Sequence, residues 1–371
     1  MYNVYQHWDP LKVCIVGRSY NPKFYDYIKN DKVRKVFYRI AEETEEDYQK
    51  LINLLESFNV KVLRPEVSDN YHDYLINNSV LPPPMTPRDY SAMIGNNFYI
   101  NTRDLQEIWN NLQGTDWPPY PKKFQDWPKW IVDECKTDHN VCFTIKDYAF
   151  NNVLNEISPH ANIIFNRNIN SAMTTRVGKD LYFGTMNLND DMSEIKKNAQ
   201  TMFPNYRCHV IETEGHNDGT FCPVVPGLIV SLLDMPTYKN TFPDWEVIYL
   251  PGQSWSEVIP FLTLKEKNRG KWWVPGEELN EDFTNFVETW MNHWVGYVEE
   301  TVFDVNMLVI DEKNVICNNY NQKVFDAFAK RGITAHVINF RHRYFWDGGL
   351  HCITSDVHRE GTMQDNFPGR G

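Results

Sequence analysis

The sequence predicts an α/β fold, because short strand and helix patterns alternate along it and no low-complexity linker divides it. Residues 12–17 (KVCIVG) form an apolar run typical of a buried strand that ends at a glycine. Residues 41–58 carry apolar side chains at helical spacing, and residues 60–65 (VKVLRP) predict a strand that stops at proline. This strand, helix, strand order favours one large domain over residues 1–371.

Glycine and proline mark further boundaries. Residues 82–89 (PPPMTPRD) are expected to be irregular, because proline lacks a backbone donor and restricts its neighbours. Residues 91–100 predict a hairpin that turns at Gly95, and residues 103–140 predict an irregular excursion without a clean period. The remaining expected elements are helices at 145–157, 282–294 and 321–330, strands at 179–184, 207–212, 228–233 and 333–338, and a hairpin at 307–317. No internal repeat is visible.

Composition excludes several classes of protein. There are 37 Lys and Arg residues against 49 Asp and Glu, a net charge of -12 without a basic run, so nucleic-acid binding is not expected. No apolar run approaches the roughly 20 residues of a membrane span, and the first residues do not resemble a signal peptide. The 7 cysteines are scattered without a CxxC pair, which argues against a zinc site or a disulfide framework. We therefore expect a soluble protein of the reducing cytoplasm.

The segment with the most chemistry-bearing residues is GGLHCITSDVHREG, residues 348–361. Two glycines precede Cys352, and histidine, arginine and hydroxyl side chains surround it. A nucleophilic cysteine needs nearby cations or converging backbone amides to lower its pKa, and such a loop suits that need. The alternative is a packed thiol in a tight turn, and the spacing alone does not decide between the two.

Two other segments carry candidate groups. In ETEGHNDGTFCPVVPG, residues 212–227, His216 and Asp218 are two apart and point to one side of an extended chain. A histidine there can shuttle protons and a carboxylate can hold a cation, although on these residues alone a polar turn between strands is slightly favoured. In TPRDYSAMIGN, Asp89 follows Arg88, and a solvated turn is the usual role of such an aspartate.

Taken together, these segments resemble the amidinotransferase family, which includes glycine amidinotransferase and the inosamine-phosphate amidinotransferases. The resemblance runs nearly end to end through eight blocks in order: HWDPLKVCIVGR, VKVLRPE, PRD-x5-GN, TRVGKDLYF, GHNDGTFCPVVPG, NMLVIDEKNVIC, KRGITAHVINFRH and GGLHCITSDVHREGT. It implies the pentein fold, a pseudo-fivefold α/β propeller with the site at its centre.

The resemblance also implies the roles of the site residues. Cys352 matches the cysteine that attacks the guanidinium carbon of arginine, and His216 matches the histidine that protonates the leaving amine and deprotonates the acceptor. Asp89 and Asp218 match the carboxylates that hold the guanidinium, and we group Arg88 with them as substrate-binding. The expected reaction transfers an amidino group from L-arginine to an amine such as glycine, giving guanidinoacetate. It needs no metal or organic cofactor, and we allow for a homodimer.

The chain departs from the family at the residue that orients the catalytic histidine. The family has an aspartate three residues before Arg176, and this sequence has Met173. A methionine cannot hydrogen-bond a histidine strongly. Either Glu212 or Glu214 supports His216 instead, or the enzyme is slowed.

A second departure concerns the donor's amino-acid end. The family's arginine for the donor carboxylate aligns with Met235, and two family serines align with Glu299 and Glu300. These changes favour a donor with an uncharged or cationic tail, such as agmatine. Alternatively, Arg341 or Arg343 receives the carboxylate.

Three functions remain in view at this stage. The first is an amidinotransferase. The second is a hydrolase of the same superfamily, in which water replaces the amine. The third is a non-catalytic relative that binds guanidino or amino compounds, which the two methionines favour and the intact Cys352 and His216 oppose.

Overall fold

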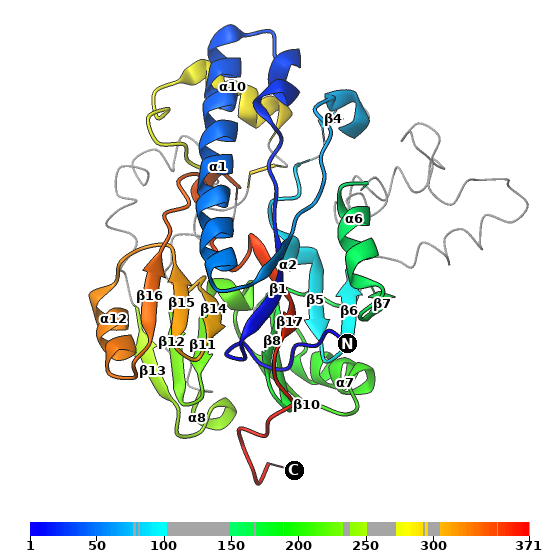
Figure 1. Ribbon diagram of the computed structural model, residues 1–371, viewed down its shortest axis with the longest axis vertical. Coiled ribbons are helices and arrows are strands. Elements are labelled where there is room, and N and C mark those ends of the chain that lie inside the picture. The colour runs from blue at the N-terminus through cyan, green and yellow to red at the C-terminus, as the bar shows by residue number, and fades with distance from the viewer. Residues whose placement is uncertain are drawn as a thin grey trace, which may run out of the picture.

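A computed structural model of the chain describes residues 1–76, 79–80, 82–101, 148–166, 168–187, 189–232, 238–250, 272–291, 294–295, 305–346 and 348–370 (Figure 1). The predicted α/β class is confirmed. The predicted excursion at residues 103–140 lies outside these ranges.

Five three-stranded sheets repeat one pattern in the described part of the chain. In each, two strands pair antiparallel and the second of them also pairs with a third, parallel strand. The sheets are β5 (Ser91–Ile94), β6 (Asn97–Ile100), β7 (Asn162–Phe165); β8 (Thr174–Val177), β9 (Asp180–Gly184), β10 (Arg207–Ile211); β11 (Phe221–Val225), β12 (Leu228–Ser231), β13 (Glu246–Tyr249); β14 (Leu308–Asp311), β15 (Asn314–Cys317), β16 (Thr334–Val337); and β17 (Thr354–Arg359), β1 (Leu11–Val16), β2 (Lys61–Leu63). This fivefold repeat agrees with the pentein fold that the resemblance implies.

Helices connect the second and third strands of these sheets. They are α1 (Asp31–Ser57), α6 (Tyr148–Ile157), α7 (Met192–Met202), α8 (Tyr238–Thr241) and α12 (Gln322–Ala329). Helix α10 (Glu281–Trp290), the one-turn helices α2 (Pro87–Tyr90) and α13 (Arg343–Trp346), the 3-10 turns η1 (Pro22–Tyr27), η2 (Tyr71–Tyr74) and η4 (Asn217–Gly219), and the short pair β3 (Leu75–Ile76) and β4 (Ser79–Val80) complete the described elements. None of the described helices has the length and apolarity needed to cross a membrane.

Helix α1 begins ten residues before the predicted residue 41, at Asp31. The side chain of Asn30 caps its first turn by accepting from the backbone N–H groups of Lys32 and Val33. Buried side chains at Val33, Phe37 and Ile40 extend the apolar stripe of the predicted helix toward its N-terminus. In Figure 1 this helix rises well beyond the sheets and lies beside α10.

The proline-rich segment is more regular than predicted. Pro87 opens the one-turn helix α2, where a missing N–H costs nothing because first-turn donors have no partner within a helix. The two predicted hairpins are confirmed as β5–β6, with Gly95 at φ +59°, and β14–β15. The other predicted strands and helices are found within a few residues of their expected bounds where the structure describes them.

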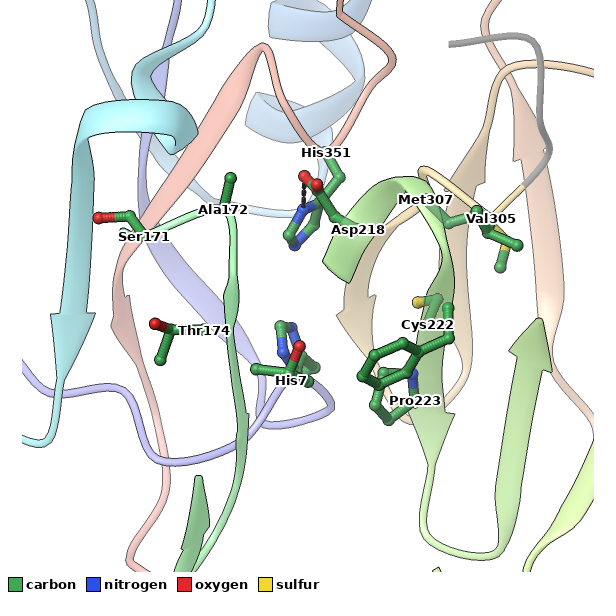
Figure 2. A pocket seen from close by; sticks show the side chains of 12 residues that line it. His7, Ser171, Ala172, Thr174, Asp218, Cys222, Pro223, Val305, Met307 and His351 are labelled. Carbon is green, nitrogen blue, oxygen red and sulfur yellow. Dashed lines mark hydrogen bonds and ion pairs between the residues drawn. The ribbon is translucent and has the colours of Figure 1, made fainter. Parts of the chain in front are cut away.

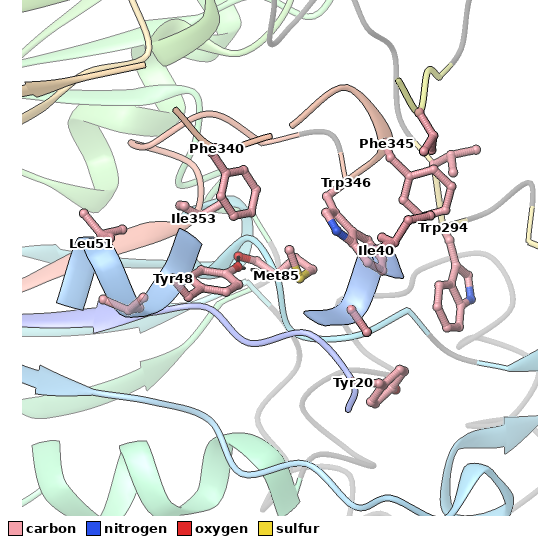
Figure 3. Close-up of a cluster of buried hydrophobic side chains, with 14 of the residues drawn as sticks. Tyr20, Ile40, Tyr48, Leu51, Met85, Trp294, Phe340, Phe345, Trp346 and Ile353 are labelled. Carbon is pink, nitrogen blue, oxygen red and sulfur yellow. Dashed lines mark hydrogen bonds between the residues drawn. The ribbon is translucent and has the colours of Figure 1, made fainter. Parts of the chain in front are cut away.

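The largest apolar cluster packs α1 against the sheet of β1 and against the segments that flank Cys352. Figure 3 shows Tyr48, Met85, Phe340 and Ile353 in this cluster, and the Tyr48 hydroxyl donates to the Met85 carbonyl at 3.0 Å. Leu350 and Ile353 are fully buried on either side of the cysteine. The core therefore anchors the loop that carries Cys352.

Asp356 on β17 joins three arginines in the interior. Its carboxylate accepts from Arg88 at 2.5 Å, from Arg176 at 2.7 Å and from Arg359 at 2.7 Å. All four side chains are at most 3% exposed. Burial opposes ionisation, but the three guanidinium groups hold the pKa of the Asp356 carboxyl well below its ordinary range. This ion cluster links α2, β8 and β17.

Replacement of Asp356 by asparagine is expected to destabilise the protein by about 3–5 kcal/mol, because it leaves buried guanidinium groups without their counter-charge. Urea unfolding at neutral pH measures this loss. Because the folded-state pKa of Asp356 is lowered, its ionised carboxylate stabilises the folded protein at pH values above the ordinary pKa of about 3.9. The difference in unfolding free energy between parent and variant therefore narrows as the pH falls below about 4.

Asp365 provides the control for this variant, because it pairs with Arg207 at 2.5 Å and its side chain is 30% exposed. Asp365→Asn should cost about 1 kcal/mol or less. Equal losses in the two variants would contradict the role given to the buried cluster.

Candidate active site

Two glycines, Gly348 and Gly349, precede Cys352 in the loop before β17, and other segments pack closely against both of them. A Cβ on Gly349 would lie 2.5 Å from Oδ1 of Asn306, and a Cβ on Gly348 would lie 2.8 Å from Cγ2 of Thr86. Neither approach leaves room for a side chain. The glycines therefore allow segments from three parts of the chain to meet at the cysteine.

Cys352 is only 6% exposed, and its sulfur contacts polar groups of Asn306 and Asp218. The side-chain amide Nδ2 of Asn306 lies 2.9 Å from Sγ, and the carboxylate Oδ2 of Asp218 lies 3.3 Å from it. The sulfur thus lies between a hydrogen-bond donor, the amide of Asn306, and a negative charge, the carboxylate of Asp218.

Asp218 lies in the turn η4, in the segment predicted from the sequence to carry a functional carboxylate. Burial alone would raise the pKa of its carboxyl, but the hydrogen bond with His351 and the nearby His216 and Arg88 lower it to about 2. The carboxylate is therefore ionised at neutral pH. Its second oxygen, Oδ1, is buried and has no hydrogen-bond partner among the described residues.

His351 Nδ1 lies 2.8 Å from Oδ2 of Asp218, as the dashed line in Figure 2 shows. Burial and the charge of Arg88 lower the pKa of this imidazole, so it is neutral at neutral pH. A neutral ring beside an ionised carboxylate donates from the nitrogen that faces it, which places the hydrogen on Nδ1. His351 therefore orients Asp218 beside the sulfur.

Arg88 reaches the same loop from α2. The Arg88 backbone N–H donates to the carbonyl of Cys352 at 3.3 Å, and its Nε donates to the carbonyl of Thr354 at 3.0 Å. One terminal nitrogen of its guanidinium donates to Asp356, and these contacts hold Arg88 against the loop of Cys352. Its role in substrate binding stays a prediction. Asp89 follows Arg88 in α2 and is half-buried.

His216 immediately precedes η4 and is half-buried. The next residue, Asn217, ties this segment to that of Met173: its backbone N–H donates to the carbonyl of Ala172 at 3.0 Å and its Nδ2 to that of Met173 at 2.9 Å. The two segments that the family uses for its histidine and its orienting aspartate are thus adjacent. The influence of Met173 on His216 stays a prediction.

Three other predicted site residues, Met235, Glu299 and Glu300, lie outside the described residues. Arg341, an alternative partner for a donor carboxylate, donates from Nε to Asp47 of α1 at 2.9 Å and from a terminal nitrogen to Glu46 at 2.7 Å.

Arg343, the other alternative, is also engaged. It is buried and donates to Asn339 at 2.7 Å and to the Tyr344 hydroxyl at 2.7 Å. Both guanidinium groups serve the packing of the segment before Cys352.

Two neighbours of the site were not predicted. Asn306 lies in the NMLVID block but has no chemical signature there, because a lone asparagine before an apolar strand is common. His7 lines a cavity of about 10 Å³ with Asp218, Cys222 and His351 (Figure 2). That volume suits about one water molecule and is too small for a guanidino donor.

No group of three or more histidine, cysteine or acidic side chains in the described ranges is arranged to hold a metal ion. The assembled groups are a thiol, an ionised carboxylate, a neutral imidazole and amide donors. This set suits nucleophilic attack by sulfur on a cationic carbon centre.

Comparison with known proteins supports this chemistry. No model of a known protein family matches the sequence. The chain is 24% identical to mitochondrial glycine amidinotransferase of Xenopus tropicalis, over 98% of this chain and 84% of that protein. It is 22% identical to L-arginine:L-lysine amidinotransferase of Pseudomonas savastanoi pv. phaseolicola, over 84% and 77% of the two chains.

Solved structures show the same fold. SxtG, an amidinotransferase of the saxitoxin biosynthetic pathway from Microseira wollei, matches with a TM-score of 0.63 and 18% identity over 99% of both chains. Inosamine-phosphate amidinotransferase StrB1 from Streptomyces griseus matches with a TM-score of 0.60 and 16% identity over 98% of both chains.

The fold and the site thus define a cysteine-centred protein of the pentein type. The resemblance to the amidinotransferase family is confirmed over nearly the whole chain, and amidinotransferase function is supported.

Proposed function

We propose that the protein transfers an amidino group from L-arginine, or a related guanidino donor, to an amine such as glycine through an amidino-Cys352 intermediate. The observation that carries this proposal is the ionised carboxylate of Asp218, 3.3 Å from the Cys352 sulfur. A carboxylate opposes the ionisation of a neighbouring thiol. A guanidinium bound to Asp218 removes that opposition and brings its own carbon to the sulfur. The site therefore favours a planar cation over a neutral ester or amide.

The reaction proceeds in two halves. The thiolate attacks the guanidinium carbon, and the bond from that carbon to the donor's nitrogen breaks as His216 protonates the leaving amine. The amidino group then remains on sulfur. In the second half, His216 removes a proton from the acceptor amine, which attacks the amidino carbon and releases the thiolate. Asp89 and Asp218 hold the planar group throughout. Two moderate barriers replace one high barrier.

For the donor's far end we propose a preference for an uncharged or cationic tail, as in agmatine. The resemblance aligns Met235, Glu299 and Glu300 with the groups that receive an arginine carboxylate in the family. Loss of a charge-assisted partner from a buried carboxylate costs on the order of 2–5 kcal/mol. The contacts of Arg341 and Arg343 with other protein groups weaken the alternative of a relocated clamp.

The test is an incubation with arginine or agmatine, each with and without glycine or lysine, followed by mass spectrometry of the products and the protein. We expect a new guanidino compound only when an amine is present, and a higher kcat/KM for agmatine than for arginine. A higher kcat/KM for arginine, lost on replacing Arg341 or Arg343, would refute the altered donor preference.

The same experiment separates the other two functions. A ureido product or ammonia formed without any amine would identify a hydrolase. Binding of donor with neither product nor protein adduct would identify a non-catalytic relative and overturn the proposal.

A further inference from the structure

The side-chain amide of Asn306 lies 2.9 Å from the Cys352 sulfur, yet no catalytic role follows for this residue from the sequence. It is fully buried and precedes β14, in the sheet of β14, β15 and β16. Its side chain spans the gap between that sheet and the loop of Cys352. It contacts the loop through both ends of its amide group.

The orientation of this amide is determined by the backbone. Oδ1 lies 2.8 Å from the backbone nitrogen of His351 and 3.2 Å from that of Cys352. Backbone N–H groups can only donate, so the amide oxygen must face them. A flipped amide would bring its NH₂ against two donors. The NH₂ group therefore faces the sulfur at 2.9 Å and the carbonyl of Asp218 at 3.3 Å.

Gly349 allows the loop to lie against Asn306. A Cβ at that position would lie 2.5 Å from Oδ1 and 2.8 Å from Cβ of Asn306. The loop thus approaches the asparagine as closely as a glycine allows. Such an approach holds the NH₂ group in place against Sγ.

We propose that Asn306 is a catalytic residue that donates a hydrogen bond to the Cys352 thiolate. The inference rests on the proposed role of Cys352 as a nucleophile. Asp218 disfavours a second negative charge 3.3 Å away until a cationic donor arrives. A fixed N–H donor stabilises the anionic sulfur before, during and after the transfer, including when the thiolate leaves the amidino carbon. No proton leaves Asn306 in this role.

The test is the pH dependence of Cys352 alkylation by iodoacetamide, with the modified peptide identified by mass spectrometry. No donor or acceptor is present, so the result does not depend on which substrates the enzyme uses. Asn306→Ala removes the hydrogen-bond donor to the sulfur, and we expect it to raise the midpoint of the alkylation profile by about one to two pH units. Asn306→Asp should raise it at least as far, because it adds a negative charge.

Asn318 offers a matched control. It is also buried, and its Nδ2 donates to the backbone carbonyl of Asn306 at 3.3 Å without contact to the sulfur. Asn318→Ala should keep the midpoint within a few tenths of a unit of the parent, even if it lowers the unfolding midpoint in urea by as much as Asn306→Ala does.

The proposal fails if Asn306→Ala, shown to be folded by its urea transition, keeps the parent's alkylation midpoint. It also fails if Asn318→Ala shifts the midpoint equally, because the effect would then come from packing. If Asn306→Ala shifts the alkylation midpoint as expected but no pair of substrates is converted, the role of Asn306 as a hydrogen-bond donor is supported and the proposed function is refuted.

Discussion

Cys352→Ala is expected to lower amidino transfer by about 10,000-fold or more, because the covalent route needs the thiol of this residue. With the parent protein and a donor alone, mass spectrometry should show an added amidino group on the peptide that contains Cys352. The variant should show none. Turnover that survives the substitution would exclude the covalent mechanism.

Cys222 gives a control for this experiment. It is 6% exposed, as Cys352 is, and lies in β11 near Asp218. Burial raises the pKa of its thiol to about 12, so it is a protonated core residue at neutral pH. Cys222→Ala should retain the adduct on Cys352 and most of the transfer rate. Loss of the adduct in this variant would point to a general disturbance of the core.

His216→Ala is expected to lower the transfer rate by about 100-fold to 10,000-fold, the usual range for a positioned acid and base. The parent rate should change with pH in the neutral range, and the variant should lose that dependence. The measurement is kcat/KM across pH, with the amount of adduct as a second readout. Donor binding should change little, since Asp89 and Asp218 remain.

His336 is a suitable comparison for this variant. It is half-buried on β16, where its ring contacts Asn314 and Phe58. His336→Ala should leave the pH profile unchanged. The companion substitution Met173→Asp should raise the transfer rate and change its pH profile. If both the rate and the pH profile stay as in the parent, residue 173 does not orient His216.

Much of the fold follows from local patterns. The hairpins at residues 91–100 and 307–317 could be predicted because glycine or polar turn residues separate short apolar runs. The start of α1 was missed because Val33 and Val36 favour strands, although their spacing continues the helical stripe. The five sheets could not be recognised as repeats, since they share strand order and not sequence.

The site was predictable in part. The flanking glycines drew attention to Cys352, and the resemblance to a family supplied His216, Asp89 and Asp218. Asn306 could not be found this way, because its role depends on the sheet of β14 lying against a loop 46 residues further along the chain. The pairing of Arg88 with Asp356 could not be predicted either, because a charged side chain in a polar segment does not reveal that its partner is a buried aspartate.

The pairing of β17 with β1 has a consequence for synthesis of the protein. Asp356 follows Arg88 by 268 residues and Arg176 by 180 residues, so both arginines leave the ribosome long before the carboxylate that neutralises them. A nascent chain cannot bury these cations at low cost until its last strand docks beside its first. The loop that leads into this strand carries the sulfur of Cys352. A polypeptide cut short before this segment would therefore lack both that thiol and the charge balance of its interior, and we expect that it would not persist as a folded protein.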